Sequence, residues 1–221
     1  MFIGVEFLPG WMVLASSLLM LTACAAAALL APWASIRAVP ARLHLVLGGA
    51  IFCLLLWLMS VHMVAQLWLH FIGISCLVML LGLRLALLAG ALASFLYAII
   101  IGESLLGVPT AWLLTVLLPG AVSRLVLYAV ARLRSKNLFL YMLGGGFCGG
   151  MLAMLAMAAG SLLVFWLIGA RDWLQSALEN WSLISLVLFP EGFINGMLIT
   201  TLTVFYPQLV KTFDDIHYLG D

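Results

Sequence analysis

Long apolar stretches separated by short polar segments run through the whole sequence. A helix that crosses the hydrocarbon core of a bilayer needs about 20 mostly apolar residues, and shorter helices are tolerated when flanking side chains snorkel. This pattern predicts about seven membrane-spanning helices, at Trp11–Pro32, His44–Met59, Gln66–Leu83, Leu85–Ile101, Ala111–Ala131, Leu138–Ile168 and Ser182–Val210. The fold class expected is therefore an all-α, polytopic membrane protein.

The composition agrees with this interpretation. Hydrophobic residues make up 67% of the chain, charged residues only 8%, and the mean hydropathy is +1.28. These values lie far outside those of soluble globular domains, and a net charge of +1 indicates no nucleic-acid partner. Because no linker, charge block or internal repeat divides the chain, residues 1–221 are expected to form a single domain embedded in the lipid bilayer.

The distribution of basic residues predicts the orientation of the helices, because lysine and arginine are enriched in cytoplasmic loops. With the N-terminus outside, seven of the nine basic residues face the cytoplasm: Arg37, Arg42, Arg84, Arg132, Arg134, Lys136 and Lys211. Arg171 then lies outside and Arg124 lies within the fifth predicted helix. The C-terminus is accordingly expected to be a short cytoplasmic tail, residues 211–221.

The stretch "LTAC", Leu21 to Cys24, resembles the cleavage box of a bacterial lipoprotein signal peptide. No lysine or arginine precedes it, however, and the apolar run continues beyond it, so this segment is expected to be a retained membrane helix. The four cysteines are widely spaced within apolar runs, which indicates small core residues rather than disulfides or a zinc site.

Four ionisable residues are predicted at membrane depth: His70, Glu103, Arg124 and Glu191. Such residues cost at least ~2.5–3.5 kcal/mol on insertion scales and normally face the bundle interior with a partner or a task. The predicted topology places His70, Glu103 and Glu191 in the outer half, where they could share one outward-facing pocket with Glu6. For Arg124, the simplest expectation is an internal ion pair with Glu191 or Glu103.

The chemistry that such a pocket suggests is the capture of a transition-metal cation. Neutral imidazole is a good ligand for nickel, cobalt, copper and zinc, and carboxylates add charge or orient the ligands. The alternative for His70 is a hydrogen-bonded packing residue. No catalytic motif such as GxSxG, HExxH or Walker A occurs, so we expect neither an enzyme nor a required cofactor.

Methionines offer a weaker signal. Met59, His62 and Met63 share a short loop, and Met151, Met154 and Met157 recur every three residues along the sixth predicted helix. Thioethers together with imidazole favour Cu(I), although methionines at helical spacing also serve as ordinary packing residues. In the same predicted helix, the glycine patch Gly144–Gly150 should let a neighbouring helix approach closely.

Three stretches together resemble one family. The opening "MFIGVEFLPGW", the segment "HFIGISCLVMLLGLRLALLAGALASFLYAIIIGE" from His70 to Glu103, and "EGFINGMLITTLTVF" from Glu191 are similar, in the same order, to motifs of the CbiM/NikM family. These proteins are the substrate-capture membrane subunits of energy-coupling-factor transporters for cobalt and nickel.

The resemblance implies seven helices, an external N-terminus, and a nitrogen-rich metal site suited to Ni(II) or Co(II). In that site the N-terminal amine, here that of Met1, and a histidine at position two join the histidine that matches His70. This chain carries Phe2 at the second position and Ser185 roughly where a histidine often occurs in the final helix.

The leading hypothesis is therefore a substrate-binding permease subunit of a metal-uptake system in a bacterial inner membrane. The expected metal ligands are His70, Met1, Glu6, Glu103 and Glu191. A coupling transmembrane subunit and ATPase subunits are the implied partners. Two alternatives remain open: a non-transporting scaffold or assembly subunit with the same fold, and a membrane protein that handles copper.

Overall fold

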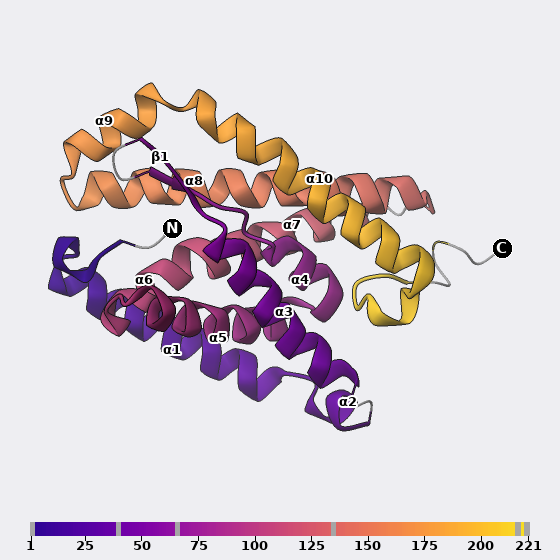
Figure 1. Ribbon diagram of the computed structural model, residues 1–221. Helices are drawn as coiled ribbons and strands as arrows, with labels where there is room; N and C mark the ends of the chain where they lie inside the picture. The colour runs from indigo at the N-terminus through magenta and orange to yellow at the C-terminus, as the bar shows by residue number, and fades with distance from the viewer. Residues whose placement is uncertain (1–2, 39–40, 65–66, 134–135, 215–217, 219–221) are drawn as a thin grey trace.

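The computed structural model describes residues 3–38, 41–64, 67–133, 136–214 and 218 as a bundle of helices that run largely side by side (Figure 1). The helices and strands are, in chain order, η1 (Val5–Phe7), α1 (Gly10–Leu30), α2 (Trp33–Ala38), α3 (Ala41–Leu58), β1 (Val61–Val64), β2 (Leu67–Leu69), α4 (Ile74–Leu81), α5 (Leu83–Ile101), η2 (Leu105–Gly107), α6 (Val108–Trp112), the π-helical η3 (Leu113–Leu117), α7 (Leu118–Arg132), the π-helical η4 (Leu140–Cys148), α8 (Gly149–Leu167), α9 (Arg171–Glu179), α10 (Ser182–Phe205) and η5 (Pro207–Leu209).

Five helical stretches in the described chain are long and apolar enough to cross a membrane. They are Gly10–Leu30, Leu83–Ile101, Leu105–Arg132, Leu140–Leu167 and Ser182–Phe205. The apolar part of α3, Leu43–Leu58, is shorter. The expectation of a multi-pass helical membrane protein is thus confirmed. These helices match six of the seven predicted ones to within a few residues. The exceptions are the fifth predicted helix, which starts earlier, and the last, which ends earlier.

The third predicted span, Gln66–Leu83, is wrong. Instead of one continuous helix, β1 and β2 form an antiparallel hairpin in which Val61 pairs with Leu69, and the chain then turns into the short helix α4. The turn uses Gly73, whose positive φ of 69° is readily adopted only by glycine. Eight residues cannot cross a bilayer, so hydropathy alone mistook a buried core segment for a span.

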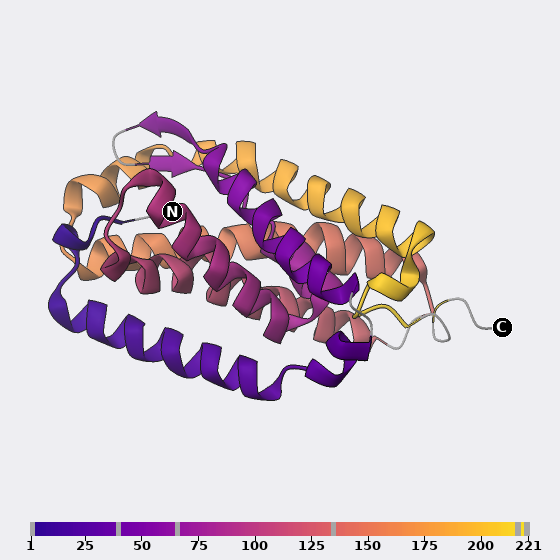
Figure 2. The same cartoon turned by 60° about the horizontal axis from the view of Figure 1, so that its bottom comes forward.

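Helix α4 lies at the centre of the molecule (Figure 1). All eight of its residues are buried, and it packs against α3, α5, α7, α8 and α10. An apolar helix without an exposed face is a core element rather than a lipid-facing one. Helices α3, α5, α7, α8 and α10 therefore surround α4, and the hairpin extends from its N-terminal side toward the end of the bundle where α9 lies (Figure 2).

Glycines allow α8 and the preceding η4 to lie close against α10, as the glycine patch predicts. A Cβ atom added to Gly146 would lie 3.2 Å from the Cα atom of Gly196, and one added to Gly150 would lie 3.1 Å from the Cα atom of Gly192. The two backbones are thus in direct contact, as in membrane helix pairs with small residues at the interface.

Replacing Gly192 by alanine should destabilise this crossing. The new Cβ atom would lie 2.8 Å from the carbonyl oxygen of Phe147, a backbone atom that cannot move independently. Overpacking costs about 1–3 kcal/mol, which should lower the melting temperature in detergent by about 5 °C. Gly48→Ala is the matched control, because a Cβ atom there meets nothing within 4 Å, and its melting temperature should stay equal or rise. Equal melting temperatures for Gly192→Ala and the wild type would contradict the close crossing.

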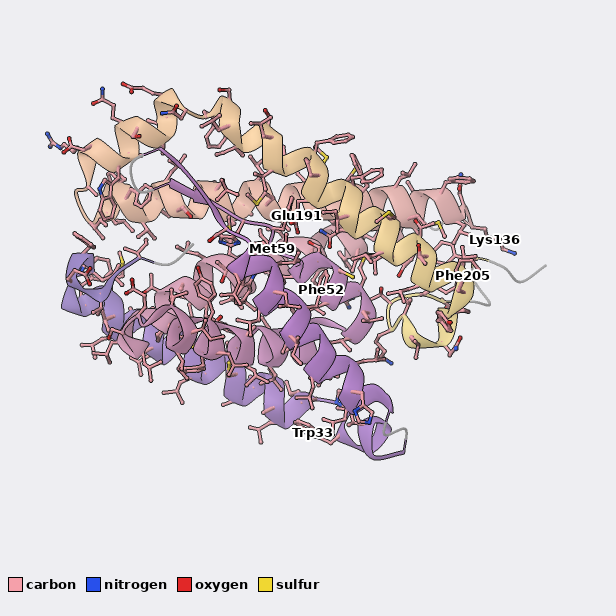
Figure 3. All side chains as sticks on the ribbon, in the orientation of Figure 1. Trp33, Phe52, Met59, Lys136, Glu191 and Phe205 are labelled. Atoms are coloured by element: carbon pink, nitrogen blue, oxygen red, sulfur yellow. The ribbon has the colours of Figure 1, made fainter. Side chains whose placement is uncertain are left out.

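The two ends of the bundle differ in charge. Helix α9, with Asp172 and Glu179, lies at the end where α1 begins (Figure 1). At the opposite end Lys136 lies on the side of the C-terminus (Figure 3), and Arg84 lies near Lys211. The basic residues that the sequence predicts on one side of the membrane thus lie at the opposite end of the molecule from these acidic residues.

Candidate functional site

His70 lies in the connection between β2 and α4, and its side chain is only 5% exposed. The Nδ1 atom lies 3.0 Å from the carbonyl oxygen of Phe71. Because a carbonyl oxygen can only accept, Nδ1 must carry the hydrogen in this contact, and Nε2 then carries the lone pair. A hydrogen bond of this kind fixes the tautomer of the imidazole, as it also does for histidines that bind metals.

Aromatic side chains form one wall of the surroundings of His70. The Trp57 ring lies edge-on to the imidazole at 6.5 Å between ring centroids, and the ring of Tyr97 lies edge-on to Trp57 at 6.2 Å. The Nε1 atom of Trp57 donates a hydrogen bond of 3.1 Å to the carbonyl oxygen of Ile72. Trp57 therefore anchors the backbone two residues after His70.

Glu191 and Asn195 of α10 hold the N-terminal end of α4. The carboxyl group of Glu191 accepts hydrogen bonds from the backbone N–H groups of Ile72 and Gly73, at 2.8 and 2.9 Å. Asn195 accepts one from the N–H group of Cys76 at 2.8 Å and donates one to Glu191 Oε1, also at 2.8 Å. Glu191 and Asn195 are each 2% exposed, so this is a fully buried network (Figure 3).

The network answers a general requirement of helix termini. The first N–H groups of a helix have no partner within it, and the helix dipole favours a negative group at that end. A fully buried helix such as α4 has no water to supply these partners. Asn195 supplies a partner for the N–H group of Cys76 in the first turn, and Glu191 binds the N–H groups of Ile72 and Gly73 just before it. Together they fix the connection that carries His70.

The C-terminal end of α4 is held by the chain that follows α10. The backbone N–H groups of Lys211 and Thr212 donate to the carbonyl oxygens of Leu80 and Met79, at 3.0 and 3.1 Å. The hydroxyl group of Thr212 donates to Met79 as well, and it lies 2.8 Å from the hydroxyl group of Tyr141. Both ends of α4 are therefore held by α10 and its continuation.

Two of the other predicted site residues are exposed, unlike the buried His70. Glu6 and Glu103 are exposed, the first in η1 and the second after α5, and Met1 lies outside the described residues. In the described part of the chain, no three His, Cys, Asp or Glu side chains gather closely enough to hold a metal ion. Among the members of the predicted group that the structure describes, His70 and Glu191 lie near each other in the core, where Glu191 contacts backbone groups two and three residues after His70.

The predicted ion pair of Arg124 is wrong. Arg124 is exposed on α7 and lines a pocket with Arg84 and Lys211, whereas Glu191 binds the backbone at the N-terminal end of α4. Backbone N–H groups and the side-chain amide of Asn195, not a cation, are the partners of the buried carboxyl group. The sequence marked Glu191 correctly as an unusual buried group, but only the tertiary structure reveals what it binds.

The methionines of the predicted copper motif whose side chains the structure describes do not form one cluster, and the side chains of His62 and Met63 lie outside that description. Met154 and Met157 are buried in the hydrophobic core, whereas Met59 is 69% exposed at the end of α3. Met151 lies against Gly192 in the crossing with α10. These positions are those of packing residues.

The sequence contained a signal, which hydropathy does not use, for the hydrogen bonds of Glu191 and Asn195 to the N-terminal end of α4. Glu191 and Asn195 are four residues apart in an otherwise apolar helix, which places both side chains on the same face. Two such groups within a membrane helix indicate a polar partner inside the bundle. That this partner is the end of a short helix could not be deduced from spacing alone.

Comparison with solved structures shows that the fold is a known one. The crystal structure of a truncated transition metal transporter has a TM-score of 0.69 with this chain at 16% sequence identity, covering 92% of this chain and 99% of that chain. The crystal structure of a transition metal transporter gives the same TM-score and identity, and covers 92% of this chain and 93% of that chain. At this identity the similarity shows the fold alone.

Sequence comparison identifies the family. No curated protein sequence matches the chain. Residues 3–209 match the family described as the cobalt uptake substrate-specific transmembrane region, CbiM, which spans nearly the whole chain. The resemblance stated from the sequence motifs is confirmed, and this chain belongs to the CbiM family.

Proposed function

We propose that this protein is the substrate-binding membrane component of an energy-coupling-factor-type transition-metal uptake system, and that its substrate is a cation of the Ni(II) or Co(II) class. The observation that carries the proposal is the buried His70 imidazole, fixed by the Phe71 carbonyl group beside a buried hydrogen-bond network in a chain of the cobalt-uptake family. Imidazole nitrogen is a preferred ligand for both metals.

In this proposal the nitrogen ligands are His70 and the N-terminal amine of Met1. Glu191 acts as a positioning residue, because both of its carboxyl oxygens accept hydrogen bonds near the N-terminal end of α4. The exposed carboxylates of Glu6 and Glu103 attract cations toward the site rather than binding them permanently.

The proposed orientation places the acidic end of the bundle outside and the basic end in the cytoplasm of a bacterial cell, with the protein in the inner membrane. The positive-inside rule supports this choice, since Arg84, Arg132 and Lys211 all lie at or near the end where α7 finishes and α5 begins. A coupling membrane subunit and ATPase subunits would act from that side, because the sequence contains no nucleotide-binding motif of its own.

The test is metal binding by the detergent-purified protein with its native N-terminus. Equilibrium dialysis against Ni(II), Co(II), Zn(II) and Cu(I), followed by elemental analysis, should show near-stoichiometric Ni(II) or Co(II). The same protein with an acetylated N-terminus is the matched control, and it should bind markedly less metal because one nitrogen ligand is blocked.

Two results would contradict the proposal. Stoichiometric binding of Cu(I) alone would favour the copper-handling alternative. A folded protein that binds none of the four metals would favour the non-transporting scaffold of the same fold.

A further inference from the structure

A second polar site lies at the basic end of the bundle, far along α4 from His70. It is a pocket of about 680 Å³, which we call the basal pocket. Its lining comes from the ends of several helices and from the C-terminal segment, and includes Arg84, Arg124, Tyr141, Lys211, Thr212 and Tyr218. The metal-site proposal uses none of these residues.

The charged side chains that line the basal pocket are all basic. Arg84, Arg124 and Lys211 come from three different elements and line the same cavity, and no acidic side chain belongs to its lining as far as the structure describes the chain. Asp214 lies nearby on the C-terminal segment, outside the lining. Three converging cations without a lining carboxylate form a site for an anion.

The basic side chains of the pocket have N–H donors that can bind a ligand. Arg84, Arg124 and Lys211 are all exposed. Nη1 of Arg84 donates to the carbonyl oxygen of Leu30 at 2.6 Å, which anchors the guanidinium group at the C-terminal end of α1. An arginine has five N–H donors, and its planar fork matches the oxygens of a phosphate group. Arg84 is thus held in place while most of its donors can still bind a ligand.

The position of the pocket along the bundle indicates which source of anionic groups lies beside it. Helix α1 ends at Leu30, α5 begins at Leu83, α7 ends at Arg132 and η4 begins at Leu140, so the lining lies at the ends of the membrane-spanning helices. The rings of Tyr141 and Tyr218, 5.3 Å apart, lie at this level, as aromatic residues do at membrane interfaces. Phospholipid headgroups occupy the same level, and basic pockets between membrane helices bind anionic ones.

We propose that the basal pocket binds a phosphate-bearing anion, supplied by the headgroup of an anionic phospholipid. The bound phosphate would contact Arg84, Arg124 and Lys211. Because Lys211 and Thr212 also hold the C-terminal end of α4 through their backbone N–H groups, an occupied pocket would stabilise the segment that fixes α4.

The experiment measures lipid retention by the full-length protein in detergent. Native mass spectrometry with phosphatidylglycerol and with phosphatidylcholine as probes should show preferential retention of phosphatidylglycerol. Removing single cations, in Arg84→Gln, Arg124→Gln and Lys211→Gln, should weaken retention about five-fold each. Arg124→Lys, which keeps the charge, should retain most of the preference.

Arg171→Gln is the matched control, since it removes a cation from α9 at the opposite end of the bundle and should leave lipid retention unchanged. Melting temperatures show whether each variant is folded. Should Arg84→Gln fail to fold because its contact with α1 is lost, the Arg124→Gln and Lys211→Gln double variant carries the test.

A parallel titration with inorganic phosphate and soluble glycerol phosphate distinguishes the source of the anion. Binding of phosphatidylglycerol that depends on these cations supports the proposal as stated. Cation-dependent binding of soluble phosphate without a preference for phosphatidylglycerol would overturn the lipid source. Equal retention of both lipids together with no phosphate binding, or a preference that survives removal of all three cations, would overturn the site itself.

Discussion

Replacing Glu191 by alanine should lower the melting temperature of the detergent-solubilised protein by about 10 °C or more. The substitution leaves the N–H groups of Ile72 and Gly73 and the amide group of Asn195 without their carboxyl partner in a buried site. Each buried donor left unsatisfied costs about 1–3 kcal/mol, so the total is about 4 kcal/mol. For a chain of this size, 1 kcal/mol corresponds to about 2–4 °C.

A series of variants tests whether the loss of these hydrogen bonds causes the lower melting temperature. Glu191→Gln keeps the shape and one acceptor oxygen, so its melting temperature should lie between those of the wild type and Glu191→Ala. Asn195→Ala should be milder than Glu191→Ala, because it leaves one backbone donor, the Cys76 N–H group, without its partner, while both carboxyl oxygens of Glu191 keep their bonds to backbone N–H groups. Glu179→Ala is the control, since Glu179 is exposed on α9 and bonded only at the surface to Gln175. A melting temperature of Glu191→Ala close to that of Glu179→Ala would show that Glu191 does not hold α4.

The membrane-spanning helices could be predicted from the sequence because one physical requirement dominates them. Every backbone group of a lipid-exposed segment must be bonded within the segment, so a long apolar run can only be a helix. The segments Gly10–Leu30, Leu140–Leu167 and Ser182–Phe205 follow this rule, and their predicted bounds differ by a few residues. The later C-terminal bound predicted for the last helix overlooked Pro207, which begins a separate short turn.

The same rule fails where protein rather than lipid surrounds the chain. Residues 67–81 are as apolar as a span, but the backbone groups of this segment find partners in the hairpin, in Glu191 and Asn195, and in the C-terminal segment. Irregular backbone at membrane depth is tolerated when it is buried in protein. Hydropathy indicates that a segment avoids water but not whether lipid or protein surrounds it. It therefore could not distinguish this buried segment from a membrane span.

The sequence pointed to two residues of the candidate site but not to what they contact. His70 and Glu191 stand out in the sequence because buried ionisable groups are costly in an apolar segment. Their roles depend on contacts between residues about 120 positions apart, such as the bond from the Ile72 N–H group to Glu191. No local pattern encodes such a pairing.

Replacing His70 by alanine should weaken the binding of Ni(II) or Co(II) by more than about 100-fold, since losing even a residue that orients a ligand costs roughly 10–100-fold. The measurement is a metal titration of the folded protein, followed by the visible absorption of bound Co(II), whose spectrum depends on its nitrogen ligands. His44→Ala is the matched control, because His44 is exposed on α3.

Comparison with Glu191→Gln separates ligation from positioning. If His70 is the ligand and Glu191 holds its backbone, Glu191→Gln should weaken metal binding by about 10-fold without changing the Co(II) absorption spectrum, whereas His70→Ala should abolish that spectrum. If His70→Ala is folded and binds Co(II) with an unchanged spectrum, His70 is a packing residue against Trp57, and the ligands lie elsewhere in the chain. The hydrogen bond that fixes His70 Nδ1 on the Phe71 carbonyl group favours the first outcome, because it puts the hydrogen on Nδ1 and the lone pair, which a metal ion would need, on Nε2.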